Sequence, residues 1–227
     1  MLVLGLDTSS PAVSAALVEV GEDGCTTRAE HVVVDGRRHG ELLASGVRTV
    51  LGGAPPTVLD AVVVGVGPGP FTGLRVGLVT AAALSDALDV PAYGVCSLDG
   101  LVAPGGQDVV VVTDARRREV YWARYAAGER VEGPEVARPD ALAAHLRTLS
   151  PAPRLVGAGA VLHREVLAGG DAVSRDGEGG PLHVSVPVLV AAAAARVLAH
   201  APSDPLTPLY LRRPDAVEPG ARKRVHA

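Results

Sequence analysis

The chain has 227 residues, of which 48% are hydrophobic and 20% charged, so its composition is that of a globular protein and excludes a disordered one. A formal net charge of −4 and a pI near 6.0 exclude a general electrostatic attraction of the whole chain to nucleic acid or membranes. The length allows one large unit or two compact halves.

Cysteine content and the lengths of the apolar runs indicate the cellular compartment of the protein. Cys25 and Cys96 lie far apart and form neither a disulfide framework nor a zinc-binding pair. The N-terminus lacks the basic region of a signal peptide, and the longest apolar run, residues 184–195, is shorter than the roughly 20 residues of a membrane span. We therefore expect a cytoplasmic protein without membrane contact.

Apolar runs and helical spacings predict the elements of the first half. Strands are expected at residues 2–7, 13–20, 30–35 and 60–66, helices at 39–51 and about 72–88, and a further strand within 91–98. The run at 60–66 does not alternate between apolar and polar residues, which predicts a strand buried on both faces.

The second half repeats this order. Strands are predicted at 108–114, 119–126 and 154–160, helices at 139–149 and about 187–199, and a surface loop at 168–181. The sequence GGQD near residue 106 marks a boundary, which gives an N-terminal lobe, 1–104, and a smaller C-terminal lobe with a basic tail, 105–227. This pattern predicts an α/β fold of two ribonuclease-H-like lobes, as in the actin-like ATPase superfamily.

An ATPase of this fold needs a glycine in the turn after the first strand of each half, so that backbone N–H groups can approach phosphates. The two turns here begin at Asp7 and Asp114, and neither contains a glycine. The first could still bind an anion through Asp7, Thr8 and Ser9, with Asp7 as an ordinary turn residue at the strand end as the alternative. The second places three arginines, residues 116–118, where a narrow turn is required. A working ATPase site is therefore not expected.

A glycine-rich segment, GVGPGPFTGLRVG at residues 65–77, joins a strand to a helix. Its spacing matches no standard phosphate-binding motif. In the following helix, small residues recur every four positions and form one stripe, which permits close approach of another backbone. With apolar residues of the preceding helix, the stripe supplies the candidate partner-interface residues: Leu43, Val47, Gly73, Gly77, Ala81 and Ser85. A central helix of a large core is the alternative.

Searches for metal ligands and nucleophiles give no candidate, because no histidine pair has ligand spacing and no serine or cysteine has a catalytic motif. No catalytic residue, metal site or cofactor bound by the chain alone is therefore predicted. The C-terminal cluster is compatible with contact to RNA or an acidic partner, or with a solvated tail. Its members are Arg212, Arg213, Arg222, Lys223 and Arg224.

Several segments together resemble one family, TsaB (YeaZ), the dimerisation subunit of the bacterial machinery that installs threonylcarbamoyladenosine beside the tRNA anticodon. The segments are LGLDTSSPAVSAAL at 4–17, GPGPFTGLRVG at 67–77, DARRREVYWARY at 114–125 and PLYLRR at 208–213. The resemblance implies a subunit without its own catalytic site that pairs with the paralogue TsaD and works with the ATPase TsaE. It also implies that Ser97 and Leu101 occupy the positions of the TsaD metal-binding histidines.

In the family, the first two helices form the surface that pairs with TsaD, and isolated subunits can self-associate through it. The resemblance thus predicts a non-catalytic scaffold that contacts tRNA through the complex, with a nucleotide at the complex interface left open. The alternatives are a glycoprotease-like metallopeptidase, which needs metal ligands, and an actin-like ATPase or kinase, which needs glycine in the phosphate turns.

Overall fold

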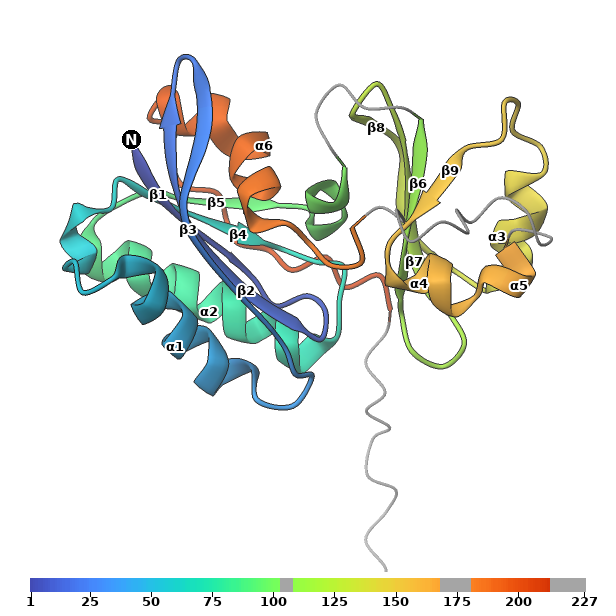
Figure 1. Ribbon diagram of the computed structural model, residues 1–227, viewed down its shortest axis with the longest axis horizontal. Helices are drawn as coiled ribbons and strands as arrows, with labels where there is room; N and C mark the ends of the chain where they lie inside the picture. Colours follow the sequence, from blue (N-terminus) through green and yellow to red (C-terminus); the bar gives the residue numbers. More distant parts are fainter. Residues whose placement is uncertain (103–107, 168–180, 213–227) are drawn as a thin grey trace, which may run out of the picture.

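The computed structural model describes residues 1–102, 108–167 and 181–212, and contains two α/β lobes side by side, each built around one sheet (Figure 1). The first sheet has strand order β3-β2-β1-β4-β5, and the second has β8-β7-β6-β9. In each sheet an antiparallel hairpin is extended by a parallel strand, β4 beside β1 and β9 beside β6. This mixed order confirms the predicted ribonuclease-H-like fold.

The elements of the first lobe follow the predicted order. They are β1 (Leu2–Asp7), β2 (Ala12–Gly21), β3 (Gly24–Val34), α1 (His39–Leu51), the short helix η1 (Pro56–Val58), β4 (Ala61–Gly65), α2 (Phe71–Leu88), β5 (Ala92–Val95) and the short helix η2 (Ser97–Leu101). The predicted bounds of α1 are confirmed, and its end is fixed by Gly52, which has a φ of 58°. β4 is fully buried, as its continuous apolar run predicts.

The remaining elements depart from the predictions at several points: the helix predicted at 139–149 ends at residue 146, and two short helices between residues 158 and 167 were not predicted. These elements are β6 (Val109–Asp114), β7 (Val120–Ala126), β8 (Glu129–Ala137), α3 (Pro139–Leu146), β9 (Arg154–Val156), α4 (Ala158–Leu162), α5 (Arg164–Leu167) and α6 (Val186–Leu198). The strand predicted to reach residue 160 ends at Val156, because Gly157 turns the chain with a φ of 97° into α4. β8 was not predicted, since three glutamates and a Gly-Pro pair interrupt its apolar pattern.

Helix α6 covers the first sheet, although it lies near the end of the chain (Figure 1). Side chains of alternate strand positions face opposite ways: Val3 and Val63 pack towards α6, while Leu4 packs towards α1 and α2. The contact with α6 is close, because a Cβ on Gly5 would lie 2.4 Å from Val186 Cγ1. The predicted division into 1–104 and 105–227 therefore needs correction, since α6 belongs to the first lobe. The predicted boundary and residues 168–180 of the loop predicted at 168–181 fall outside the described residues.

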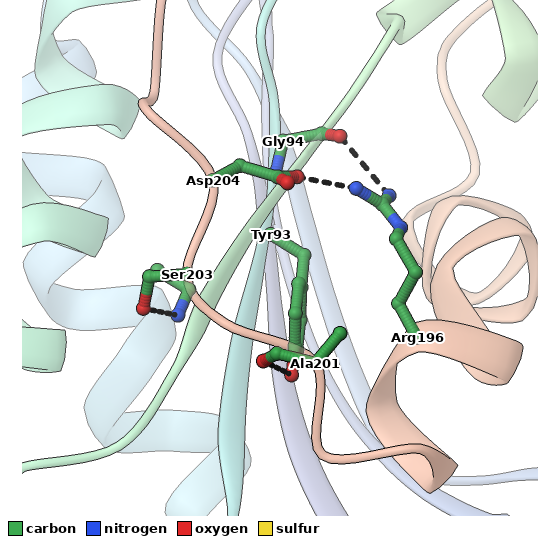
Figure 2. A network of polar contacts seen from close by, with 7 residues as sticks. Tyr93, Gly94, Arg196, Ala201, Ser203 and Asp204 are labelled. Atoms are coloured by element: carbon green, nitrogen blue, oxygen red, sulfur yellow. Dashed lines mark hydrogen bonds and ion pairs between the residues drawn. The ribbon is translucent and has the colours of Figure 1, made fainter.

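The segment after α6 covers the open edge of the first sheet at β5 (Figure 2). Asp204 Oδ2 accepts the Gly94 N–H at 3.0 Å, and the Ser203 hydroxyl oxygen accepts the Ala92 N–H at 3.1 Å. Arg196 of α6 pairs with Asp204 and donates to the Gly94 carbonyl at 3.1 Å. Side chains thus satisfy edge groups that would otherwise be available to pair with another strand.

This edge cover yields a stability prediction. Asp204→Ala should lower the free energy of unfolding by about 1–2 kcal/mol, because the Gly94 N–H and the Arg196 guanidinium lose their acceptor. Urea denaturation of Asp204→Ala, Arg196→Ala and the double variant would measure the coupling, which we expect to be below about 1 kcal/mol because both side chains are about one-third exposed. A loss below about 0.3 kcal/mol for Asp204→Ala would contradict this role.

Candidate functional site

The glycine-rich segment between β4 and α2 packs around the end of β1. Gly65 lies against the Asp7 carboxylate so closely that a Cβ there would stand 1.9 Å from Asp7 Oδ2. Gly69 lies on the backbone of Ser9, where a Cβ would be 2.2 Å from the Ser9 carbonyl oxygen. These glycines serve close packing of two backbone segments.

Asp7 is buried at this junction, with 1% of its surface exposed. Its Oδ1 accepts from the backbone N–H and the hydroxyl of Ser9, at 3.0 and 2.9 Å, and its Oδ2 accepts from the Ser97 hydroxyl at 2.7 Å. Burial raises the pKa of Asp7, and the hydrogen bonds from Ser97 and Ser9 oppose this rise. The carboxylate therefore connects β1 to η2 within the core of the first lobe.

Thr8 holds the first turns of α2. Its hydroxyl donates to the Gly73 carbonyl at 2.8 Å and accepts the Gly77 N–H at 3.0 Å. A Cβ on Gly77 would lie 2.6 Å from the Thr8 Oγ1, so only glycine leaves room for this contact. Together with the bonds of Asp7 and Ser9, this arrangement uses the side-chain oxygens of all three candidate anion-binding residues inside the lobe. The predicted anion site at Asp7, Thr8 and Ser9 is therefore corrected to a packing junction.

The stripe of small residues on α2 also faces inward. Gly73, Gly77 and Ala81 are buried against the lobe's own β1 turn and sheet, and the Ser85 hydroxyl donates to the Val90 carbonyl at 2.6 Å. In α1, Leu43 is buried. The four buried candidates, Leu43, Gly73, Gly77 and Ala81, cannot meet a partner directly, so their assignment as interface residues is corrected. The other two candidates, Val47 and Ser85, are partly exposed.

The outward face of α2 is exposed and largely apolar, with Thr72, Arg75 and Asp86 as its exposed polar residues. Val79 has 66% of its surface exposed and Phe71 has 42%. Ala82, Ala83 and Ala87 are exposed on the same helix. By length and composition alone α2 could cross a membrane, but its inner face packs on the sheet of this lobe. We define the outer face of α2 by Phe71, Arg75, Val79, Ala83 and Ala87.

Residues near the end of the described chain extend the outer face of α2 at its N-terminal end. The rings of Tyr210 and Phe71 lie 5.0 Å apart, and the Arg75 guanidinium stands 3.8 Å from the Phe71 ring centre. Arg75 also donates to the Tyr210 hydroxyl at 3.2 Å. An exposed cluster of two aromatic rings and an arginine has the composition of an interface hot spot.

A cavity lies between the two lobes, with lining residues from both. Its volume is about 250 Å³, and its polar lining residues are Ser9, Ser10, Thr113, Asp114, Arg116 and His183. Most of its wall is apolar: Pro11, Pro68, Pro70, Leu98, Leu101 and Leu162. Apolar walls suit a triphosphate poorly, and Pro68 and Pro70 have no N–H group to offer it.

The positions implied for a metal site are filled by core residues. Ser97 is fully buried and bonded to Asp7, and Leu101 is buried in the apolar core. Within the described ranges, no group of three or more histidine, cysteine, aspartate or glutamate side chains gathers as a metal site.

Asp99, on η2 of the first lobe, links the two lobes. Its Oδ1 accepts from the Tyr125 hydroxyl of β7 at 2.7 Å and lies 3.5 Å from Arg130 Nε of β8. Burial raises the pKa of Asp99, while Tyr125 and Arg130 favour its charged form. The contact fixes η2 against the second sheet.

The chain is similar to proteins of one known family. Residues 33–152 match the family model described as TsaD, tRNA N6-adenosine threonylcarbamoyltransferase. An uncharacterized protein of Mycobacterium tuberculosis H37Rv is 47% identical over 221 residues, covering 94% of this chain and 93% of that protein. The tRNA threonylcarbamoyladenosine biosynthesis protein TsaB of Escherichia coli K12 is 30% identical over 190 residues, covering 78% and 80%.

Solved structures agree with these matches. A crystal structure from Pseudomonas aeruginosa, described as similar to the peptidase YeaZ, is 27% identical with a TM-score of 0.71, covering 93% of this chain and 99% of the other. The structure of YeaZ from Pseudomonas aeruginosa gives a TM-score of 0.63 at 24% identity, covering 90% and 100%.

The packing at Gly65 predicts a sharp difference between two Gly→Ala variants. Gly65→Ala should cost about 3 kcal/mol or more, or prevent folding, because its Cβ would overlap Asp7. Gly40→Ala, in α1 with no atom within 4 Å of the added Cβ, should be neutral or slightly stabilising. Thermal and urea unfolding would measure both; equal stability of the two variants would refute the packing role.

The raised pKa of Asp7 predicts how stability changes with pH. A carboxyl group with a folded-state pKa above its unfolded value of 3.8 lowers stability at neutral pH, and this loss is relieved as pH falls through the folded pKa. The free energy of unfolding of Asp7→Asn, relative to that of the wild type, should therefore be highest near pH 7 and lowest near pH 4. Urea unfolding at several pH values would measure this difference; a stability difference independent of pH would contradict the prediction.

Proposed function

The chain belongs to the TsaB (YeaZ) family, and we propose that it is a non-catalytic scaffold subunit that pairs with a TsaD paralogue. Family membership gives it a role in tRNA threonylcarbamoyladenosine biosynthesis, for which its relatives are named. In this proposal TsaD transfers the threonylcarbamoyl group, TsaE is recruited to the pair, and this chain contacts tRNA through the complex.

The observation that carries the proposal is the exposed outer face of α2. Its residues Phe71 and Val79 are large, apolar and accessible, although the opposite face of the same helix is buried. An apolar helix face of this kind gains free energy when a second surface covers it. We infer that TsaD packs on this face and on the neighbouring partly exposed side of α1, and that two copies of this chain associate there when TsaD is absent.

The hydrogen bonds already made within the turn after β1 support a role without catalysis. A phosphate at that turn would compete with α2 for the Thr8 hydroxyl and with Asp7 for the Ser9 hydroxyl, both of which are already bonded. This weakens the ATPase or kinase alternative. The metallopeptidase alternative lacks support at Ser97 and Leu101, where a buried hydroxyl and a leucine stand.

The test is threonylcarbamoylation of tRNA by the cognate TsaD and TsaE, with threonylcarbamoyl-adenylate supplied, with and without this chain. We expect modification only when the chain is added, and none from the chain alone. Equal turnover without the chain would refute the scaffold role, and nucleotide hydrolysis by the chain alone would favour the ATPase alternative.

Matched variants locate the pairing face. Val79→Arg should weaken binding to TsaD at least tenfold and lower modification in step, because a charge would be buried at the interface. Val131→Arg, at an exposed position on β8 of the second lobe, serves as the control and should bind normally. Calorimetry or analytical ultracentrifugation would measure pairing, and circular dichroism would check the fold. Normal pairing by Val79→Arg would exclude this face.

A further inference from the structure

The turn between β6 and β7 carries an unexplained concentration of charge and backbone strain. Arg116, Arg117 and Arg118 have φ values of 63°, 51° and 62°. The left-handed region crowds the Cβ of any residue except glycine, and asparagine or aspartate tolerate it better than arginine does. The sequence nevertheless places three long cationic side chains here. We call these three residues the arginine turn.

The conformation of the arginine turn is held by hydrogen bonds within the hairpin. The Arg116 N–H donates to Asp114 Oδ1 at 2.7 Å, and the Glu119 N–H donates to the Arg116 carbonyl at 3.0 Å. The Ala115 N–H donates to the Glu119 carbonyl at 3.0 Å. The backbone is thus fixed, while all three arginine side chains remain exposed.

Two further segments bring positive charge to the same place. Arg37 lines a hollow of about 350 Å³ together with Arg116. Arg212 donates to the Ala115 carbonyl at 3.0 Å. The acids of the hairpin are already neutralised, since Asp114 lies 3.4 Å from Arg116 and Glu119 lies 3.5 Å from Arg212. A local excess of positive charge therefore stands on a chain whose formal net charge is −4.

We propose that the arginine turn contacts the phosphate backbone of the tRNA that the complex modifies. The inference rests on the proposed function, because TsaD would bring the tRNA to this chain. Exposed guanidinium groups on consecutive residues suit successive phosphates of a polyanion. A mononucleotide would need an enclosed site, whereas 61% of the Arg116 side chain is exposed.

The position of the turn fits this role. The hollow that Arg116 lines is also lined by Phe71 and Thr72, at the start of α2. Phe71 belongs to the outer face of α2, on which we place TsaD. The arginine turn thus lies next to the proposed pairing face, and a tRNA bound across the two subunits would pass it.

The test uses the double variant Arg117→Gly/Arg118→Gly in complex with the cognate TsaD. Glycine removes both charges and adopts positive φ without strain, so the hairpin should fold at least as well as in the wild type. Fluorescence anisotropy with labelled tRNA should give an affinity about tenfold weaker near 0.1 M salt. The slope of log K against log salt should fall by about 2, as expected for the loss of two phosphate contacts.

Two matched variants control the experiment. Arg117→Lys/Arg118→Lys keeps the charge and should retain most of the affinity and the salt slope. Arg147→Gln/Arg164→Gln removes two exposed charges from the same lobe, at the end of α3 and on α5, and should bind tRNA as the wild type does. An equal loss in this control would mean that only net charge matters and would overturn the proposal.

The remaining outcomes separate the inference from the proposed function. Unchanged tRNA affinity and salt slope in the glycine variant, with normal TsaD pairing, would overturn the inference and leave the scaffold role standing. Loss of TsaD pairing in the glycine variant would make the turn a protein contact and would also overturn it. If the wild-type chain does not pair with TsaD, the scaffold role fails, and the same titration of the isolated chain at low salt decides the inference.

Discussion

The first lobe depends on the closure of one chain segment over the end of β1. There the Asp7 carboxylate is buried among hydroxyl and N–H donors, Gly65 packs against it, and Gly69 packs on the backbone of Ser9. Backbone and side chain approach within distances that a single methyl group would prevent. The same close contact that packs the junction keeps the side-chain oxygens of Asp7, Thr8 and Ser9 in hydrogen bonds within the lobe.

Helix α2 joins this junction to the surface of the molecule. Thr8 binds two backbone groups in its first turns, so the orientation of the helix is set by the end of β1. Because the inner side is committed to the core, the outer side is presented in a fixed direction. A rigid helix face loses little conformational freedom when a partner covers it, which favours association.

The sequence predicted the fold and the bounds of α1 well, because helical spacing and Gly52 both mark that helix. It could not orient the small-residue stripe of α2, since Gly77 permits close approach by any backbone, and here the neighbour is Thr8 of the same lobe. The outer face of α2, with Val79, follows only once that orientation is known. Three arginines at 116–118 were visible in the sequence, but their left-handed conformation depends on the hairpin around them.

The position of α6 has a consequence for how the protein is made. The strands of the first sheet leave the ribosome early, but the helix that covers one of their faces, Val186–Leu198, is synthesised after the whole second lobe. Until then, Val3, Val63 and Tyr93 have no cover on that side. The first lobe therefore completes its core after translation of the second, and a nascent or truncated chain exposes an apolar sheet that chaperones would bind.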